Sequence, residues 1–285
     1  MKVMIMGFGN MGKTYANSFI SSRFIKPDDI HVLGRDAFKI QSEIGIPLQN
    51  ISSIPTAKIS DFDIIILSVK PQDFKQLAIS VKPFIKENQL LLSVMAGVTI
   101  TTIQGELNCL KVVRSMPNIP TQIGMGMTVF SASTNVDRKE LFIIQNLINT
   151  AGKSVYVEDE KLLNAATTIS GSGPAYVFYF MNAMIKAAVD LGFNESEAEL
   201  LVNQTFMGSV AIQNSYSLSN EEWIAKVASK GGTTESALRV FEKGVLAFPY
   251  DRNPDCSCYI PVGDGKFYAQ GCFNGGRSKE WLEMS

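Results

Sequence analysis

Ile5–Phe19 of this chain reads IMGFGNMGKTYANSF, and its three glycines decide the fold. Gly7, Gly9 and Gly12 follow an apolar run, Val3–Met6, and precede a helical pattern. In this spacing the first glycine permits a tight turn, the second lets the backbone approach a diphosphate, and the third lets helix and strand pack closely. The start of the helix favours an anion through its free N–H groups and its dipole. The stretch therefore predicts a strand–turn–helix unit that binds a dinucleotide; a tight turn without a ligand is the alternative.

The region up to residue 158 alternates short apolar runs with helical patterns, which is typical of a parallel α/β sheet. The runs DIIILSV and LLLSV lack alternation, as expected of strands that are covered on both faces. Helices are expected between the strands, for example over Asp73–Lys86 and Asp137–Thr150. We expect strands at Val3–Met6, His31–Leu33, Ile64–Val69, Leu90–Val94, Lys111–Arg114, Met127–Phe130 and Ser154–Val157.

Only helices are expected after residue 158. The sequence thus predicts a Rossmann-type dinucleotide-binding domain over residues 1–158 and an all-helical domain over residues 159–285, with 245–276 irregular because it is rich in Pro, Gly, Asp and Asn. The clearest helix, GPAYVFYFMNAMIKAAVDLG, has Pro174 in its first turn and stops at Gly192. This helix is apolar almost all round and should be buried on every side. A small helical domain can hardly enclose it alone, whereas an intertwined dimer can.

Composition and residue usage exclude several classes of function. A net charge of -1 and the lack of any Lys- or Arg-rich run argue against a nucleic-acid surface or an anionic membrane. No apolar run approaches the ~18 residues that span a bilayer, and no signal-peptide pattern precedes Gly7, so we expect a cytoplasmic protein. His31 is the one histidine, which excludes a His-based metal site and a Ser-His-Asp triad. Cys256, Cys258 and Cys272 lack zinc-ribbon spacing, so no metal is expected.

The end of the second expected strand, HVLGRD, indicates which dinucleotide is bound. Gly34 and Arg35 stand where an NAD site has an acidic residue, and Asp36 follows only at the start of the next helix. A guanidinium matches a ribose 2′-phosphate by charge and by bidentate geometry. The sequence therefore favours NADPH, with NADH as the alternative cofactor and a solvated surface residue as the alternative role of Arg35.

Two further strand ends point toward the same crevice. LSVKPQD supplies Val69, Lys70 and Pro71, and LSVMAGV supplies Ala96 and Gly97, which are small enough for a flat ring to lie against the backbone. Open α/β sheets bind their ligands at such strand ends. Plain strand-to-helix turns are an equal alternative for both segments.

Segments in the order GFGNMG, SVKPQ, SVMAGVTI, VRSMPNIPTQIGMG, ISGSGPAYVF and KGGTTESAL strongly resemble the Δ1-pyrroline-5-carboxylate reductase family, the last enzymes of proline synthesis. The resemblance runs from Met1 to about Gly244. It implies NAD(P)H-dependent reduction of a cyclic imine, pyrroline-5-carboxylate, to L-proline. It also implies homodimers built through the helical domain, which commonly assemble into decamers or other rings. In the family, the site lies between the Rossmann domain of one subunit and the helical domain of its partner.

The resemblance also implies roles for individual residues. The family threonine that matches Thr234 lies near the imine nitrogen, so Thr234 is the candidate for polarising or protonating it; orienting the ring or capping the helix are the alternatives. Gly231 and Gly232 are expected to form a turn with open N–H groups, and Thr233 and Thr234 to begin a helix, which suits the substrate carboxylate. The cofactor residues implied are Met6, Gly7, Phe8, Gly9, Asn10 and Met11 at the pyrophosphate, Gly34 and Arg35 at the adenosine 2′ end, and Ser68, Val69, Lys70, Pro71, Val94, Met95 and Ala96 at the ribose and nicotinamide.

Several other residues have less specific expectations. Asn50 is a weak match to a family asparagine on the adenosine side, and Asn118 is expected to be a wall residue. In SGSGPAY, Ser170, Ser172 and Tyr176 either border the pocket or merely accompany close helix packing.

The chain departs from the family pattern in two places, and two other functions stay open. Lys230 replaces the proline of the family loop Pro-Gly-Gly, and Val245–Gly276 intervenes where the family continues in one long helix. One alternative is a catalytically silent, NADPH-binding regulatory paralogue. The other is a different NADP-dependent reductase of the β-hydroxyacid dehydrogenase kind, although SGSGPAYVFYFMNAM lacks the helix lysine of that class.

Overall fold

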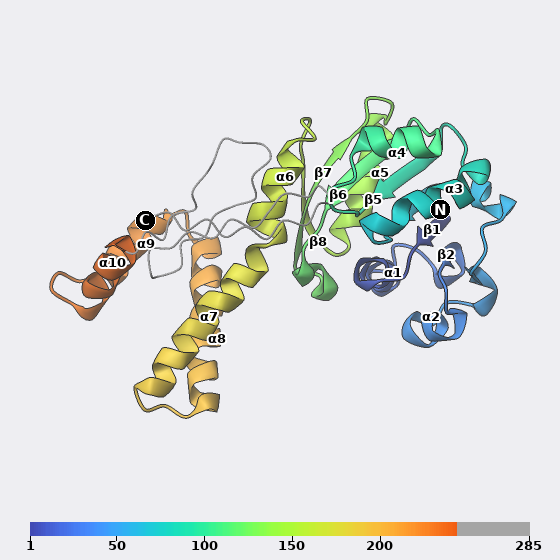
Figure 1. Cartoon of the computed structure of the whole chain (residues 1–285). Helices are drawn as coiled ribbons and strands as arrows, with labels where there is room; N and C mark the ends of the chain where they lie inside the picture. Colours follow the sequence, from blue (N-terminus) through green and yellow to red (C-terminus); the bar gives the residue numbers. More distant parts are fainter. Residues whose placement is uncertain (244–285) are drawn as a thin grey trace, which may run out of the picture. The chain divides into compact units, whose positions relative to one another are not determined.

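The computed structural model describes residues 1–243, and Figure 1 shows their helices and strands. The chain forms two compact units, Met1–Pro174 and a second that begins at Ala175. The division falls inside a helix, beyond the expected domain border at residue 158, which directly follows the last expected strand, Ser154–Val157. We keep the border at residue 158 as a proposal for the end of the dinucleotide-binding domain.

The centre of the first unit is one eight-stranded sheet (Figure 1). Its strands are β1 (Val3–Met6), β2 (Ile30–Leu33), β3 (Ile51–Ser52), β4 (Ile64–Leu67), β5 (Leu90–Ser93), β6 (Val112–Met116), β7 (Gly126–Ala132) and β8 (Gly152–Tyr156). They lie in the order β3-β2-β1-β4-β5-β6-β7-β8. The order of the first six strands, 3-2-1-4-5-6, is that of the Rossmann fold. The expected Rossmann-type sheet is therefore confirmed.

The strands expected from the sequence are all present, with small shifts at their ends. β3 escaped prediction because two residues show no periodicity. One pair departs from the parallel arrangement, because β7 runs antiparallel to β6. A parallel crossover needs about a dozen residues, and the connection between these strands, Pro117–Met125, is shorter. This connection therefore stays at the end of the sheet where β6 finishes, and β7 runs back beside β6 in the opposite direction.

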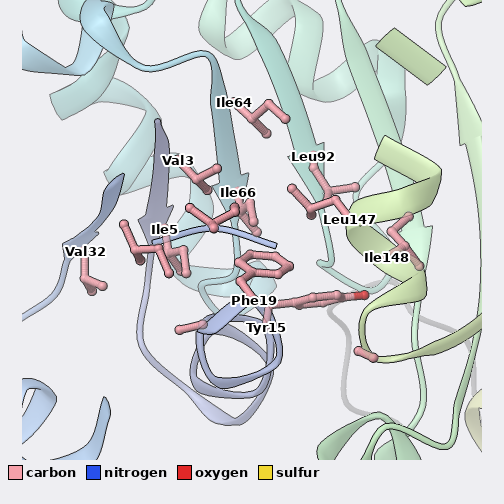
Figure 2. Close-up of a cluster of buried hydrophobic side chains, with 14 of the residues drawn as sticks. Val3, Ile5, Tyr15, Phe19, Val32, Ile64, Ile66, Leu92, Leu147 and Ile148 are labelled. Carbon is pink, nitrogen blue, oxygen red and sulfur yellow. The ribbon is translucent and has the colours of Figure 1, made fainter. Parts of the chain in front are cut away.

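Helices cover both faces of the sheet and bury two apolar clusters. Alternate strand residues point to opposite faces, so Ile5 of β1 joins one cluster and Met4 joins the other. Figure 2 shows part of the first cluster, with Tyr15, Phe19 and Leu147 among its members on one side of the strands. Every residue of β1, β4 and β5 is buried, which explains why their sequences lack a polar alternation.

Capping residues set the starts of several helices in this unit. Asp137 and Glu140 form a reciprocal capping box at the start of the expected helix over Asp137–Thr150. The helix expected over Asp73–Lys86 is divided, because Pro83 cannot continue the hydrogen-bond ladder.

The α-helices are α1 (Asn10–Ser21), α2 (Ala37–Ile44), α3 (Phe74–Val81), α4 (Ile100–Leu107), α5 (Arg138–Asn149) and α6 (Leu162–Ala166). Single 3-10 turns are η1 (Pro27–Asp29), η2 (Leu48–Asn50), η3 (Ala57–Asp61), η4 (Pro71–Asp73), η5 (Lys82–Phe84) and η6 (Ile119–Ile123), and η7 (Thr167–Gly171) is a π-helical turn.

The described part of the second unit is helical, as expected. After α7 (Gly173–Asp190), whose first residues belong to the first unit, come α8 (Glu195–Ser215), α9 (Asn220–Val227) and α10 (Thr233–Lys243). Pro174 lies in the first turn of α7, and Gly192 follows its end with φ +107°, so both expected boundary signals are confirmed. No residue of α7 is buried in the single chain. The expected burial on every side therefore requires a surface other than those which the described helices of this unit provide.

None of the helices within residues 1–243 is both long and apolar enough to cross a membrane.

Candidate functional site

The strand ends that carry the expected cofactor residues meet at one edge of the sheet. β1 lies between β2 and β4, and β5 follows β4, all in parallel. Met6 is in register with Leu33 and Leu67, and Leu67 with Ser93. The segments that follow these strands therefore lie side by side at the carboxyl edge, where open α/β sheets bind ligands. The structure thus brings together four sets of expected residues: Met6–Met11, Gly34–Arg35, Ser68–Pro71 and Val94–Ala96.

The glycine-rich turn fits the diphosphate of a dinucleotide. Gly7 has φ +95°, a conformation that glycine adopts without strain. A Cβ on Gly12 would overlap the Gly7 carbonyl oxygen and lie 2.6 Å from Ser68 Oγ, so α1 packs closely on the turn. A Cβ on Gly9 would meet no atom within 4 Å, which leaves the backbone there open. No side chain of residues 1–243 caps α1, and its first turn is free of acidic residues. Its first amides are therefore available to an anion.

Ser68 joins the glycine-rich turn to the end of β4. Its Oγ donates a hydrogen bond to the Gly7 carbonyl oxygen at 2.6 Å, and its N–H donates to the Met6 carbonyl at 2.9 Å. Ser68 therefore supports the turn, and because its hydroxyl proton is engaged there, its Oγ can only accept a hydrogen bond from a ligand. Lys70 and Pro71 follow it on the exposed rim, where Pro71 begins η4.

The turn after β5 presents backbone and small side chains at the same edge. The Val94 N–H donates to the Leu67 carbonyl at 3.0 Å, which ties this turn to β4. Met95 is 2 % exposed and belongs to the core, so only its main chain can face a ligand. Ala96 is half-buried, and Gly97 has φ +75°. Met6 is likewise a core side chain, so its expected role is also restricted to its backbone.

Arg35 and Asp36 have different roles at the end of β2. Arg35 is exposed, and no carboxylate of the described chain forms an ion pair with it. Asp36 caps α2, because its Oδ1 accepts the Lys39 N–H at 3.0 Å. A Cβ on Gly34 would lie 2.6 Å from Ile40 Cδ1, so glycine keeps α2 close to the strand end. Asp36 is thus engaged at the start of α2, while the Arg35 guanidinium, which has no ion pair within residues 1–243, is available to a 2′-phosphate.

Other polar groups of the first unit are structural. Asn50 Nδ2 donates to the carbonyls of Asp28 and Ile30 at 2.9 and 3.2 Å, so the weak expectation of an adenosine contact gains no support. His31 stacks edge-on with Phe62, and its burial, followed by the charges of Lys2 and Lys58, lowers its pKa. No cluster of metal-ligating residues occurs within residues 1–243.

Burial also excludes Tyr15 and Cys109 as proton-transfer groups. Both side chains belong to the core. Burial raises the pKa of Tyr15 to about 12 and also raises the pKa of the Cys109 thiol. Both groups therefore stay neutral near pH 7.

Two polar connections behind the β5 and β6 ends were not expected from the sequence. Arg114 Nη1 on β6 donates to Glu160 Oε1 at 2.8 Å. Asn118 Nδ2 donates to the Ser170 carbonyl at 3.0 Å, and Asn118 Oδ1 accepts the Met127 N–H at 2.9 Å. Asn118 thus anchors the π-helical turn η7, which contains the start of SGSG. No local pattern predicts these pairs, because their members are far apart in the chain.

The expectation of open N–H groups in the Gly231–Gly232 turn is wrong. Gly231 has φ +76° and begins the turn as expected, but its N–H donates to Glu235 Oε2 at 2.7 Å. The Gly232 N–H donates to the Ser229 carbonyl at 3.0 Å. The side chain of Glu235 folds back over the helix start because a carboxylate is stabilised there by amides and the helix dipole. Thr233 and Thr234 do begin α10 as expected.

The sheet order, the open glycine turn and the uncapped α1 place this chain in the class of dinucleotide-binding proteins with a Rossmann fold. A family model described as "NADP oxidoreductase coenzyme F420-dependent" matches residues 2–97, and one described as "Pyrroline-5-carboxylate reductase dimerisation" matches residues 160–249. The chain belongs to the pyrroline-5-carboxylate reductase family. Pyrroline-5-carboxylate reductase 2 of Bacillus subtilis (strain 168) is 36% identical over 247 residues, which are 85% of this chain and 87% of that protein.

Other relatives agree in sequence and in structure. Pyrroline-5-carboxylate reductase of Aquifex aeolicus (strain VF5) is 32% identical over 246 residues, 85% of this chain and 89% of that protein. The enzyme structure from Coxiella burnetii matches with a TM-score of 0.78 at 29% identity, over 86% of this chain and 91% of that one. The Plasmodium falciparum pyrroline carboxylate reductase with NADP bound matches with a TM-score of 0.75 at 28% identity, over 85% and 90% of the two chains.

Proposed function

We propose that this protein reduces Δ1-pyrroline-5-carboxylate to L-proline with NADPH as the hydride donor. The observation that carries the proposal is the extent of the similarity, since a reductase relative aligns over 85% of the chain and family models match in both units. The available guanidinium of Arg35, the engaged Asp36 and the NADP-bound relative support NADPH over NADH. The expected β-hydroxyacid dehydrogenase alternative has no comparable support. The silent paralogue is distinguished by the activity test below.

Catalysis in this chain depends on alignment and on exclusion of water. NADPH, when bound, supplies the hydride, and the ring nitrogen gains a proton, so that C=N becomes CH–NH. The turns after β1, β4 and β5 hold the cofactor through backbone and small side chains, which fixes the ring face that meets the substrate. A protonated imine is already an electrophile, so the lack of a suitable histidine does not count against the reaction.

The substrate carboxylate and nitrogen are assigned to the start of α10. With the Gly231 N–H bonded to Glu235, the first amides of α10, those of Thr233 and Thr234, are the better candidates for the carboxylate. Binding at the Gly231 N–H requires displacement of the Glu235 carboxylate, and binding at the Gly232 N–H requires displacement of the Ser229 carbonyl. Thr234 is the proposed partner of the ring nitrogen.

The active assembly is proposed to be a homodimer, and a decamer or another ring of dimers is the larger assembly proposed. The dimerisation model matches residues 160–249. In the single chain α7 exposes apolar side chains along its length, among them Val177, Phe178 and Tyr179. A second copy that covers α7 would supply the burial which residues 1–243 alone do not give this helix. We keep a cytoplasmic location as a proposal, which fractionation of cells that make the protein would test.

Arg35→Ala should weaken the binding of NADPH and leave the binding of NADH almost unchanged. Loss of a charge-assisted contact to the 2′-phosphate costs about 1.5–3 kcal/mol, so KM for NADPH should rise by roughly 10- to 100-fold. KM for NADH, which lacks this phosphate, should stay within twofold. Initial rates measured with both cofactors at fixed substrate provide the check. Lys39→Ala, which removes a nearby exposed cation, is the control, and an unaltered preference in Arg35→Ala would show that another group recognises the phosphate.

Thr234→Ala should slow imine reduction without removing cofactor binding. If Thr234 only orients the ring by a hydrogen bond, kcat/KM should fall roughly tenfold; if it donates the proton, kcat should fall by about 10²–10⁴. Thr234→Ser keeps the hydroxyl and should recover most of the rate. The assay follows NADPH absorbance with pyrroline-5-carboxylate. A wild-type protein that binds NADPH but shows no absorbance loss would be the silent paralogue.

A further inference from the structure

The turn after β5 is fixed by a hydrogen bond at each of its ends, and one of these two bonds is made by a residue outside the sheet. At its start, Val94 is bonded to β4 as described above. At its end, the N–H of Ile100, the first residue of α4, donates to Glu160 Oε1 at 2.9 Å. Glu160 lies in the segment between β8 and α6, far along the chain. Its carboxylate therefore sets where α4 begins and, with it, where the turn Val94–Thr99 ends.

The same carboxylate oxygen neutralises a buried cation. Arg114 is 4 % exposed, and its Nη1 lies 2.8 Å from Glu160 Oε1. Within the described chain Glu160 is the carboxylate that forms an ion pair with Arg114. A buried guanidinium without its partner is strongly unfavourable. Separating the ion pair would leave Arg114 buried and unpaired, at a large cost in free energy. Glu160 is therefore held beside Arg114, and its contact with the Ile100 N–H of α4 is held with it.

Arg114 is also built into the sheet directly behind the turn. It is in register with Ser93, the last residue of β5, on one side and with Ser131 on the other. Ser93 Oγ accepts the Met95 N–H at 3.2 Å, and Ser115 Oγ donates to the Ser93 carbonyl at 3.0 Å. The chain from Ser93 to Ile100 is thus fixed by a network in which Glu160 supplies the outer contact.

We infer that Glu160 is a positioning residue for the nicotinamide end of the cofactor, because the Arg114–Glu160–Ile100 contacts set the turn that carries Val94 and Ala96. The inference rests on the proposed function, in which this turn flanks the nicotinamide. Glu160 touches neither cofactor nor substrate; it acts through the position of α4. Its loss should therefore affect the nicotinamide half of the dinucleotide and spare the adenosine half, which the turns at Gly9 and Arg35 hold.

A matched control exists just before the start of β6. Glu140 pairs with Lys111 at 2.6 Å and accepts the Asp137 N–H at 3.0 Å, so it also joins a cation beside β6 to an amide at a helix start. Glu140→Gln should also cost stability, but less than Glu160→Gln, because the Lys111 side chain is 21% exposed and the Arg114 side chain 5%. A loss of NADPH affinity that is confined to Glu160→Gln, and that spares a ligand without the nicotinamide half, therefore reports the position of Glu160 and not ion-pair loss in general.

The test compares two ligands by calorimetric titration of the full-length protein. For Glu160→Gln we expect about a tenfold weaker binding of NADPH, within the range found for changes in such contact networks. Binding of adenosine 2′,5′-bisphosphate, which lacks the nicotinamide half, should stay within twofold of wild type. Glu140→Gln should bind both ligands as wild type does. In the imine assay kcat of Glu160→Gln should fall on the order of tenfold or more, because the ring is misplaced.

Equal weakening of both ligands, or wild-type affinity for NADPH, in Glu160→Gln would overturn the inference. If Glu160→Gln does not fold, Glu160→Asp decides by the same titrations, since its shorter carboxylate keeps the charge but cannot reach both Arg114 and the Ile100 N–H. A wild-type protein that binds NADPH but does not reduce the imine would refute the proposed function, and the titrations would still decide the role of Glu160. A wild-type protein that does not bind NADPH would overturn both.

Discussion

Gly12→Ala is expected to abolish tight NADPH binding and to lower the thermal unfolding midpoint by several degrees. The added Cβ would overlap the carbonyl oxygen of Gly7 and lie 2.6 Å from Ser68 Oγ and 3.3 Å from Ile5 Cγ2. The carbonyl belongs to the glycine turn itself, so the clash can be relieved only by moving that turn away from α1. Overpacking of this kind costs about 1–3 kcal/mol, and each kcal/mol lowers the midpoint by roughly 2–4 °C in a domain of this size. NADPH affinity should fall on the order of a hundredfold, about 2.8 kcal/mol.

Gly9→Ala separates the two effects. The backbone of Gly9, at φ -83° and ψ -167°, is accessible to alanine, and its Cβ would meet no atom within 4 Å. Its unfolding midpoint should therefore match wild type, whereas NADPH affinity should fall as in Gly12→Ala because the methyl group fills the approach of the diphosphate. Differential scanning calorimetry and NADPH titration of both variants provide the check. Wild-type NADPH affinity in either variant would mean that the diphosphate lies elsewhere.

Phe178→Asp is expected to convert the oligomer into monomers at micromolar concentration. Phe178 is 59% exposed on α7 in the single chain, beside the exposed Val177 and Tyr179. In a two-fold symmetric dimer the substitution is present at both copies of the contact. Removal of an aromatic side chain from the centre of an interface weakens the binding free energy by about 2–4 kcal/mol or more per site. Size-exclusion chromatography with light scattering over a concentration series would measure the change. Imine reduction should be lost together with the dimer if the partner completes the site.

Phe142→Asp provides the matched comparison. Phe142 is 65% exposed on α5 in the first unit, so the same chemical change is made at a similarly exposed aromatic residue outside α7. This variant should keep the oligomeric state and the activity of wild type. An oligomer that persists in Phe178→Asp at low concentration would exclude this part of α7 from the interface.

The cofactor half of the site was predictable because its information is local. The spacing of Gly7, Gly9 and Gly12 specifies a turn conformation and a close helix contact, and both depend on residues within one strand–turn–helix unit. The apolar runs at β1, β4 and β5 likewise predicted buried parallel strands. Parallel strands then bring their carboxyl ends to one edge, so the approach of Gly34, Ser68 and Val94 followed from strand order alone.

The contacts that refine the site were not predictable, because they join distant segments. Nothing distinguishes Glu160 from its acidic neighbours Glu158 and Asp159 in the sequence, and only the folded sheet brings it to Arg114. The capture of the Gly231 N–H by Glu235 depends on a side-chain conformation, which a separation of four positions permits but does not require. The antiparallel return of β7 likewise depended on the length of a loop whose ends were uncertain.

The sequence by itself determined the dinucleotide turn, the alternation of strands and helices, the start of α7 around Pro174 and its end just before Gly192, and the family. These features arise from backbone preferences and side-chain periodicity over a few residues. Only the tertiary structure decided the anchoring of α4 by Glu160, the restriction of Met6 and Met95 to backbone roles, and the exposure of α7 in the single chain. Each of these depends on which distant surfaces exclude water from one another, and burial of that kind exists only once the chain has folded.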